Sequence, residues 1–210
     1  MRKIHFVLPL LLLTATACQS QDRKVEQNRG VGGPCEGCEA IFEYGDKRLT
    51  AIDTLPDFGK NEPKIKLTGT VFEKDGKTPA ENVILYIYHT DRNGVYATQG
   101  QAKGWAKRHG YIRGWIKTGP SGEYTFYTFR PAAYPGGTEP EHIHVTVKEP
   151  NKNEYYIDEV VFADDPMLSQ KERSELQNRG GLGIVRPRLE NGMLTVKRDI
   201  VLGLNIPGYE

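Results

Sequence analysis

Two histidines stand two residues apart in His142-Ile143-His144, within a run that alternates apolar and polar side chains. On a β-strand, residues i and i+2 point to the same face, so this spacing predicts two imidazoles side by side while Ile143 and Val145 face the core. Imidazole is a good ligand for iron, copper, zinc and nickel, so the pair is half of a transition-metal site. Such a pair also occurs on solvated strand faces, and the surrounding sequence must decide between the two interpretations.

Four short motifs occur in order along the segment that ends at this pair. They are Arg113-Gly114-Trp115, Gly122-Glu123-Tyr124, Arg130-Pro131-Ala132-Ala133-Tyr134-Pro135 and Pro140-Glu141-His142-Ile143-His144. In type, order and spacing they resemble the motifs of the intradiol ring-cleavage dioxygenases. The resemblance extends upstream to Leu67 and downstream to Pro166, which is most of the chain after residue 60.

The resemblance implies a ferric iron, Fe(III), held by two tyrosines and two histidines. By motif position these ligands are Tyr96, Tyr134, His142 and His144. The set is chemically consistent, because phenolate is a hard anionic donor suited to the ferric state and neutral imidazoles fill the remaining positions. The ordinary alternative for each tyrosine is to pack a loop onto the core with its hydroxyl satisfied.

The resemblance also implies the substrates, a catechol-type aromatic diol and O2, and no organic cofactor. The diol chelates the metal as a dianion, and the tyrosinate that it displaces, assigned here to Tyr134, acts as a base. The ring then opens between its two hydroxylated carbons. Three aromatic residues before the motifs, Tyr111, Trp105 and Trp115, suit the walls of a site for a planar ring, and equally suit an ordinary core.

The sequence departs from the family pattern at two positions. Family members that cleave catechols usually carry arginine three residues before the first histidine, where this chain has Glu139, and often a glutamine where it has Glu159. A carboxylate in place of a guanidinium raises the cost of an anionic intermediate. Arg113 or Arg130 is the candidate replacement cation, although both also suit structural salt bridges.

These departures keep alternative functions open. The first is a catalytically inactive β-sandwich lipoprotein that binds a ligand or partner at the cell envelope, with the metal site vestigial. The second is a protein that keeps iron without oxygen chemistry. A sandwich fold cannot choose among them, because only the site discriminates.

The elements that must position these side chains are short strands. Gly 23, Pro 13 and Tyr 11 in 210 residues, without long helical stripes, predict an all-β chain. We expect a β-sandwich of antiparallel strands with long loops and one short helix. The expected strands cover 65–71, 83–88, 111–117, 124–129, 142–147, 155–162 and 194–202.

Turn residues predict three connections. Gly119-Pro120-Ser121-Gly122 lies between two strands and predicts that 111–117 and 124–129 pair as a hairpin. Asn191-Gly192 predicts a second, tight hairpin. Asp164 or Asp165, followed by Pro166, predicts the start of a short helix that runs toward Leu176.

The first residues predict export. Arg2 and Lys3, the apolar segment 6–13 and the small residues before Cys18 are typical of a signal peptide over residues 1–17. They resemble a bacterial lipoprotein signal, which implies cleavage before Cys18, lipidation of its thiol and attachment to the envelope at its periplasmic or outer-membrane face. An ordinary secretory peptide is the alternative. We expect a flexible tether and extension over 18–60 and the dioxygenase-like domain over 61–210.

Two further cysteines, Cys35 and Cys38, lie in the extension. An exported compartment is oxidising enough to join them, so a local disulfide is the prediction. A zinc site would need two more ligands nearby, and a thioredoxin-like pair would need a βαβ pattern that the sequence lacks.

The charges are balanced, with 28 Lys and Arg against 27 Asp and Glu. No net field attracts nucleic acid, and membrane attachment is expected only through the lipid at Cys18.

Overall fold

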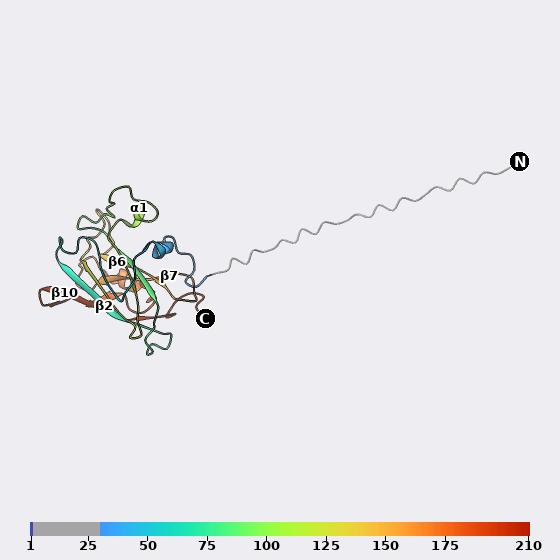
Figure 1. Cartoon of the computed structure of the whole chain (residues 1–210). Coiled ribbons are helices and arrows are strands. Elements are labelled where there is room, and N and C mark those ends of the chain that lie inside the picture. The colour runs from blue at the N-terminus through green and yellow to red at the C-terminus, as the bar shows by residue number, and fades with distance from the viewer. Residues whose placement is uncertain (2–29) are drawn as a thin grey trace.

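Two β-sheets pack face to face in the computed structural model, which describes Met1 and residues 30–210 (Figure 1). The strands are β1 (Ile52–Thr54), β2 (Lys64–Phe72), β3 (Ile84–Tyr88), β4 (Arg113–Lys117), β5 (Glu123–Phe129), β6 (His142–Lys148), β7 (Tyr155–Phe162), β8 (Ile184–Val185), β9 (Arg188–Glu190), β10 (Met193–Lys197) and β11 (Ile200–Val201). The helices are a 3-10 helix, η1 (Cys38–Phe42), and two α-helices, α1 (Ala106–His109) and α2 (Gln170–Glu175). The predicted β-sandwich is confirmed.

One sheet has the order β1-β5-β2-β10-β9, with β11 also paired to β2, and the other has the order β4-β3-β6-β7-β8. The central pairs β2–β5, β3–β4, β3–β6 and β6–β7 are antiparallel, as expected. The pairs β1–β5, β2–β10, β2–β11 and β7–β8 are instead parallel. Parallel pairs need crossover connections, so they left no turn signal in the sequence.

Strand β2 shows how the sequence builds the core. Its burial alternates along nine residues, with Ile65, Leu67 and Val71 buried and the intervening side chains half-exposed. These side chains pack in one cluster with Leu85 and Ile87 of the facing sheet. Removing such a side chain from water stabilises the fold by about 1.5–3 kcal/mol.

The hairpin predicted for residues 111–129 is wrong. Strand β4 pairs with β3 and β5 pairs with β2, so the two strands lie in different sheets. The turn between them is tight, with the Gly122 amide donating to the Gly119 carbonyl at 2.9 Å, but it carries the chain across the sandwich. A glycine turn can close a hairpin within one sheet or carry the chain between two sheets. Here the pairing of β5 with β2 and of β4 with β3 selects the crossing.

The hairpin predicted at Asn191-Gly192 is confirmed by the antiparallel pair β9–β10. Both turn residues have positive φ, 51° and 79°, which a two-residue turn of this kind requires. The strand expected over 194–202 is divided at Arg198 and Asp199 into β10 and β11.

The predicted helix begins later than expected. Helix α2 starts after Ser169, whose hydroxyl accepts the amide of Glu172 at 3.2 Å, rather than at the Asp-Pro pair. Asp165 instead accepts the amides of Met167 at 2.8 Å and Glu141 at 2.7 Å, so it joins this loop to the start of β6. Helices η1 and α1 were not expected.

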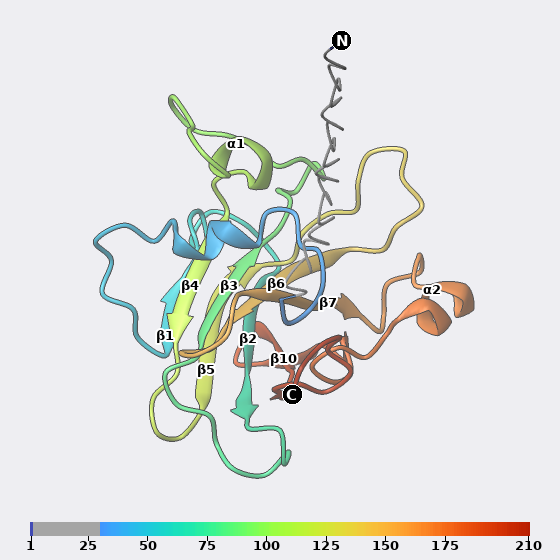
Figure 2. The ribbon, with the colours of Figure 1, turned by 90° about the vertical axis from the view of Figure 1, so that its right-hand side faces the viewer.

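Residues 30–60 pack on the sandwich. Helix η1 buries Ala40 and Ile41 against Tyr86 and Trp115, and Figure 2 shows it lying on the outer side of the second sheet. Strand β1 pairs with β5, so the first sheet contains a strand from before residue 61. A disulfide joins Cys35 and Cys38, with Cα atoms 5.7 Å apart.

The predictions for residues 2–29 lie outside the described residues. They are the signal peptide, lipidation at Cys18 and the greater part of the tether. Within the described part of the chain, no helix is long and apolar enough to cross a membrane.

Candidate metal centre

His142 and His144 lie on one face of β6, with ring centroids 4.7 Å apart. Ile143, which is fully buried, and Val145, which is 4 % exposed, point into the core from the other face. The strand alternation therefore places the two imidazoles as the sequence predicted.

Each histidine has one ring nitrogen engaged and the other turned toward the site. Nδ1 of His142 lies 2.7 Å from the Pro140 carbonyl, which can only accept, so Nδ1 carries the proton. Nδ1 of His144 lies 3.5 Å from the Glu159 carboxylate. Carbonyl and carboxylate partners of this kind orient metal-binding histidines and select the tautomer. Both Nε2 atoms are left as metal donors.

A bulge places Glu159 beside His144. The register of β6 against β7 shifts between Ile143, paired with Val160, and Val145, paired with Ile157. The extra residue on β7 turns Asp158 toward the interior, where it is 6 % exposed, and leaves Glu159 half-buried on the histidine face. Glu159, noted in the sequence as a departure from the family pattern, is thus the outer partner of a proposed ligand.

The two tyrosine hydroxyls link the two histidines in a chain of contacts between donor atoms. The hydroxyl of Tyr96 lies 2.5 Å from that of Tyr134 and 2.7 Å from Nε2 of His144. The Tyr134 hydroxyl lies 3.1 Å from Nε2 of His142. The structure therefore brings together all four side chains that the resemblance singled out.

Two loops deliver the tyrosines, and they are tied to each other. The Thr90 hydroxyl donates to the Ala132 carbonyl at 2.6 Å, and the Ala132 amide donates to Asp91 at 3.2 Å. Gly94, at φ 76°, passes so close that a Cβ there would lie 2.0 Å from the Ala133 carbonyl oxygen. Glycine permits this approach and so allows the two hydroxyls to meet.

Burial shapes the electrostatics of the centre. It raises the pKa of Tyr96, with a further rise from the hydrogen bond of Tyr134, and it also raises the pKa of Tyr134. Burial and the neighbouring His144 lower the pKa of His142. The centre therefore favours neutral phenols and a neutral His142 imidazole, and a metal cation would supply the charge that ionises the phenols.

The donor set fits ferric iron. Two ligand atoms, each about 2 Å from one ion, lie roughly 3 Å apart, close to the observed 2.5–3.1 Å. Two phenol oxygens and two imidazole nitrogens match a metal that prefers hard oxygen and accepts nitrogen. Within residues 30–210, no group of three or more His, Cys, Asp or Glu side chains could hold a metal, so this centre depends on its tyrosines.

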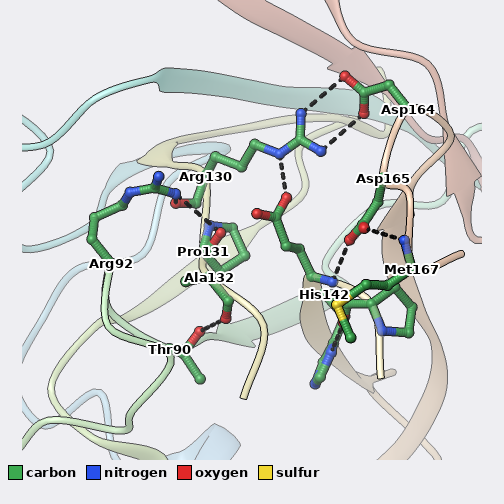
Figure 3. Close-up of polar contacts among 11 residues, drawn as sticks. Thr90, Arg92, Arg130, Pro131, Ala132, His142, Asp164, Asp165 and Met167 are labelled. Atoms are coloured by element: carbon green, nitrogen blue, oxygen red, sulfur yellow. Dashed lines mark hydrogen bonds and ion pairs between the residues drawn. The ribbon is translucent and has the colours of Figure 1, made fainter. Parts of the chain in front are cut away.

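Arg130, predicted as a source of positive charge, is held by two carboxylates. It donates to both oxygens of Asp164, at 3.0 and 2.9 Å, and to Glu141 (Figure 3). Its guanidinium also lies over the Phe162 ring, 4.6 Å from the centroid. These contacts brace the backbone immediately before His142, which is the structural salt-bridge role that the sequence left open.

Arg113 is also paired. It donates to Glu43 at 2.6 Å and lies over the Trp115 ring, 5.1 Å from the centroid. Its neighbour in the sheet is Tyr88, which in turn is paired with His144 on the far side. One aromatic residue therefore separates Arg113 from the nearest proposed ligand.

Glu139 is exposed on the loop before β6, and its charge adds to the effect of burial in raising the pKa of Tyr134. The position where the family usually has arginine thus contributes negative charge.

The three aromatic residues proposed as walls are engaged elsewhere. Trp115 is 8 % exposed and stacks on Tyr86 at 4.9 Å, and Trp105 packs on His109 at 5.1 Å. The Tyr111 hydroxyl donates to Asp57 at 2.5 Å. These residues belong to the supporting structure.

Tyr88 and His109 are neighbours of the centre that the sequence did not single out. Tyr88 stacks on His144 at 4.4 Å and on His109 at 3.9 Å. The contact follows from the register of β3 against β6, which pairs Tyr88 with His144. Strand pairing is a long-range property, so no local signal marked either residue.

A cavity of about 250 Å³ opens beside His144, and Tyr96, Tyr134 and His142 are not part of its lining. Strands β3, β6 and β7 contribute Tyr88, His144, Thr146, Tyr156 and Glu159 to its lining, and the disulfide loop 34–38 contributes the lining residues that precede the first strand in the sequence.

Comparison with known proteins identifies the family. Residues 45–189 match a family model described as a dioxygenase. A curated relative, the protocatechuate 3,4-dioxygenase beta chain of Burkholderia cepacia, is 27% identical over 140 residues, covering 60% of this chain and 58% of the relative. The chain thus spans less than two thirds of the length of that relative.

Solved structures show the same fold. The dioxygenase domain of a dioxygenase carbohydrate-binding protein fusion from Streptomyces sp. SirexAA-E has a TM-score of 0.53 at 23% identity, covering 74% of this chain and 86% of that chain. The 3-chlorocatechol 1,2-dioxygenase of Rhodococcus opacus 1CP has a TM-score of 0.58 at 17% identity, and the match covers 84% of this chain and 74% of that chain. The family match spans more than half of the sequence, so the chain belongs to the intradiol ring-cleavage dioxygenase family.

Proposed function

We propose that this protein is an Fe(III)-dependent dioxygenase that uses O2 to cleave the ring of a catechol-type aromatic diol between its hydroxylated carbons. The observation that carries the proposal is the convergence of Tyr96, Tyr134, His142 and His144, whose donor atoms are linked by three successive contacts of 2.5–3.1 Å. Family membership gives this donor set a specific chemistry.

The four side chains have different roles in the proposed reaction. Ferric iron, when bound, would supply Lewis acidity and the chemistry with oxygen. His142 and His144 are held by the Pro140 carbonyl and the Glu159 carboxylate, which leaves both Nε2 atoms free to face the tyrosine hydroxyls. The Tyr134 oxygen, on a loop that ends at an exposed segment, accepts a proton from the second hydroxyl of the diol.

Arg130 and Arg113 support this chemistry by position. Arg130 clamps Glu141 to Asp164, which fixes the start of β6 and hence His142. Arg113, paired with Glu43, adjoins Tyr88 in the sheet. Direct stabilisation of anionic charge by either guanidinium would require release from its carboxylate.

We also propose export and lipid anchoring at Cys18, on the strength of the signal-like sequence that precedes it. In a bacterial host, the full chain should incorporate labelled palmitate and fractionate with the envelope. Cys18→Ser should abolish the label, and Cys35→Ser should not.

Glu139 is the specific observation that favours a second candidate, an inactive envelope protein that binds a ligand. An exposed carboxylate replaces a cation near the proposed base, and the two nearest arginines on the motif strands are paired. This candidate predicts ligand binding without consumption of oxygen, as would a protein that only stores iron.

The deciding experiment starts from the chain from about Gln19 onward, loaded with ferric iron in air. Tyrosinate-to-Fe(III) charge transfer should give a visible absorption band, and an aromatic diol should shift the band while oxygen is consumed. Tyr134→Phe and His142→Ala should remove these signals. Tyr127→Phe, on β5 beside Phe58, is the matched control and should keep them. A colourless protein at full iron loading would contradict the proposal.

A further inference from the structure

The proposed ligand His144 stands at the end of a stack of aromatic rings. Its imidazole lies on the ring of Tyr88 at 4.4 Å and 17°, and the imidazole of His109 lies on the same Tyr88 ring at 3.9 Å and 3°. His109 is 6 % exposed, and no step of the proposed reaction uses it. Closely packed rings cannot turn independently, so the position of His109 bears on the orientation of His144.

Two contacts fix the ring of His109. The hydroxyl of Tyr86, a fully buried residue, lies 2.9 Å from Nδ1. Gly37 packs against another part of the ring, where a Cβ added to this glycine would lie 2.7 Å from Nε2 and 2.9 Å from Cε1. One of the two contacts that hold His109 therefore comes from the loop 34–38.

The Cys35–Cys38 disulfide keeps Gly37 in this position. It closes a loop of four residues that contains Gly37, with the two Cα atoms 5.7 Å apart. Gly37 itself has φ 89°, a conformation that the closed loop and the absence of a side chain make accessible. The contact with His109 thus depends on a short covalent ring.

Other restraints on this loop lie at its two ends. The Gly32 amide donates to the Pro207 carbonyl at 2.7 Å, and Cys38 is 2 % exposed where η1 begins. Between these ends, the Glu36–Arg108 ion pair joins side chains that are 72% and 62% exposed, and such a pair adds little stability. Opening the disulfide would therefore loosen the segment that carries Gly37.

The two sulfurs differ in their access to a reductant. Cys38 is buried, whereas Cys35 is half-buried and lies between the exposed residues Pro34 and Glu36. A thiolate of a dithiol reductant can attack Sγ of Cys35, and the electron pair of the broken S–S bond then passes to Sγ of Cys38, which takes up a proton. The second thiol of the reductant displaces Cys35 as a thiol, so the protein gains two electrons and two protons and the reductant becomes a disulfide.

We propose that the Cys35–Cys38 disulfide is a redox switch for the metal centre. When closed, it keeps Gly37 against His109 and so holds Tyr88 and His144 in place. When a dithiol opens it, this support is lost and the centre binds its metal more weakly. The inference rests on the proposed function, because it takes His144 as a metal ligand. By linkage, the bound metal and the closed disulfide must stabilise each other to the same extent.

The first test measures metal affinity in the closed and open states. The chain from about Gln19 onward has Cys35 and Cys38 as its only cysteines. Competition with a chelator of known affinity gives the Fe(III) affinity of the oxidised wild type and of Cys35→Ser/Cys38→Ser. We expect the double variant to bind iron five- to tenfold more weakly. Phe42→Leu, at a half-exposed position of η1 outside the ring stack, is the matched control and should stay within twofold of the wild type.

The second test measures the coupling from the side of the disulfide. Its midpoint potential is determined in dithiothreitol buffers, without metal and with gallium(III), a trivalent ion that the dithiol does not reduce. Tighter binding to the closed state makes the disulfide harder to reduce, and a tenfold difference in affinity lowers the potential of this two-electron couple by about 30 mV. Tyr88→Leu interrupts the ring stack and should at least halve the shift, whereas Phe42→Leu should keep it.

The outcomes separate this inference from the proposed function. Equal iron affinities in the wild type and in a double variant that is folded by circular dichroism, or a potential that gallium does not shift, would overturn the switch and leave the metal centre intact. A full shift in Tyr88→Leu would contradict the route through the ring stack. If neither metal binds in either state, the proposed function fails and this inference fails with it.

Discussion

Tyr88 and His144 stack with their ring centroids 4.4 Å apart and their planes inclined by 17°. The two residues are directly paired across β3 and β6, so the contact is set by the sheet. One imidazole of the candidate centre is thereby held in plane by an aromatic neighbour as well as by the carboxylate of Glu159.

Removing the stack should loosen the centre. Tyr88→Leu keeps an apolar side chain but loses the flat contact with His144, so we expect iron to be lost to a chelator several-fold faster. Tyr88→Phe keeps the ring and should restore wild-type retention. Iron remaining after a timed chelator challenge measures both. Equal loss from the two variants would assign the effect to the Tyr88 hydroxyl instead.

Glu159 should control iron affinity through His144. Glu159→Ala removes the partner of Nδ1, and loss of such a partner typically costs 10- to 100-fold in metal affinity. Glu159→Gln retains an acceptor oxygen and should lose less. Competition with a chelator of known affinity gives the values, and Glu190→Gln, exposed on β9, is the control. Undiminished affinity in Glu159→Ala would show that His144 needs no outer partner.

Replacing Arg130 should lower the stability of the folded protein. Its side chain is 14% exposed and holds two carboxylates, so Arg130→Met leaves Glu141 partly buried and unpaired. We expect a loss of about 2 kcal/mol in the free energy of unfolding, less than for a fully buried pair because Asp164 is half-exposed. Urea unfolding measures this loss, with Arg188→Met on the exposed strand β9 as the control.

Gly94 should be required for the two tyrosine loops to meet. In Gly94→Ala, the added Cβ would lie 2.0 Å from the Ala133 carbonyl oxygen, so the loops must separate and the charge-transfer band should be lost. Gly100→Ala is the matched control, because Gly100 also has positive φ, 54°, but a Cβ added there would meet nothing within 4 Å. A similar loss in both variants would point to backbone strain and not to the clash.

Buried histidine should make stability depend on pH. Burial lowers the pKa of His89 to about 4, and both ring nitrogens are engaged, with the Thr90 carbonyl and the Thr128 hydroxyl. Between pH 4 and the usual value near 6.5, the unfolded chain binds the proton that the folded chain refuses. This contribution is therefore fully present above about pH 6.5 and is lost as the pH falls toward 4.

The effect should amount to roughly 3 kcal/mol for His89. Urea unfolding at pH 7 and pH 5 measures the slope, and His89→Gln, which does not titrate, should flatten it. Burial also lowers the pKa of His109 to about 4, so part of the pH dependence of the free energy of unfolding should remain in His89→Gln. A slope unchanged by His89→Gln would assign the whole effect to other groups.

Local sequence patterns account for the strands and for the histidine pair. Period-two alternation is a property of neighbouring residues, and it predicted β2, β6 and the common face of His142 and His144. The Asn191-Gly192 hairpin was equally local, because that turn needs residues that tolerate positive φ. The two tyrosines, by contrast, were assigned through the family resemblance, since nothing local distinguishes them from packing residues.

Partners distant in sequence were decided by tertiary structure. The turn at Gly119–Gly122 could close a hairpin or cross the sandwich, and the competition of β2 and β3 for the flanking strands settled the outcome. Likewise, Arg113 and Arg130 were ambiguous until Glu43, Asp164 and Glu141 came within reach.

The sequence by itself thus determined the fold class, the face that carries both histidines and, through resemblance, the four candidate ligands. Only the tertiary structure decided which side chains adjoin them: Tyr88 through strand register and Glu159 through a bulge. The physical reason is that alternation and turn preferences act between near neighbours, whereas register, ion pairing and cavity walls depend on chain segments that meet only on folding.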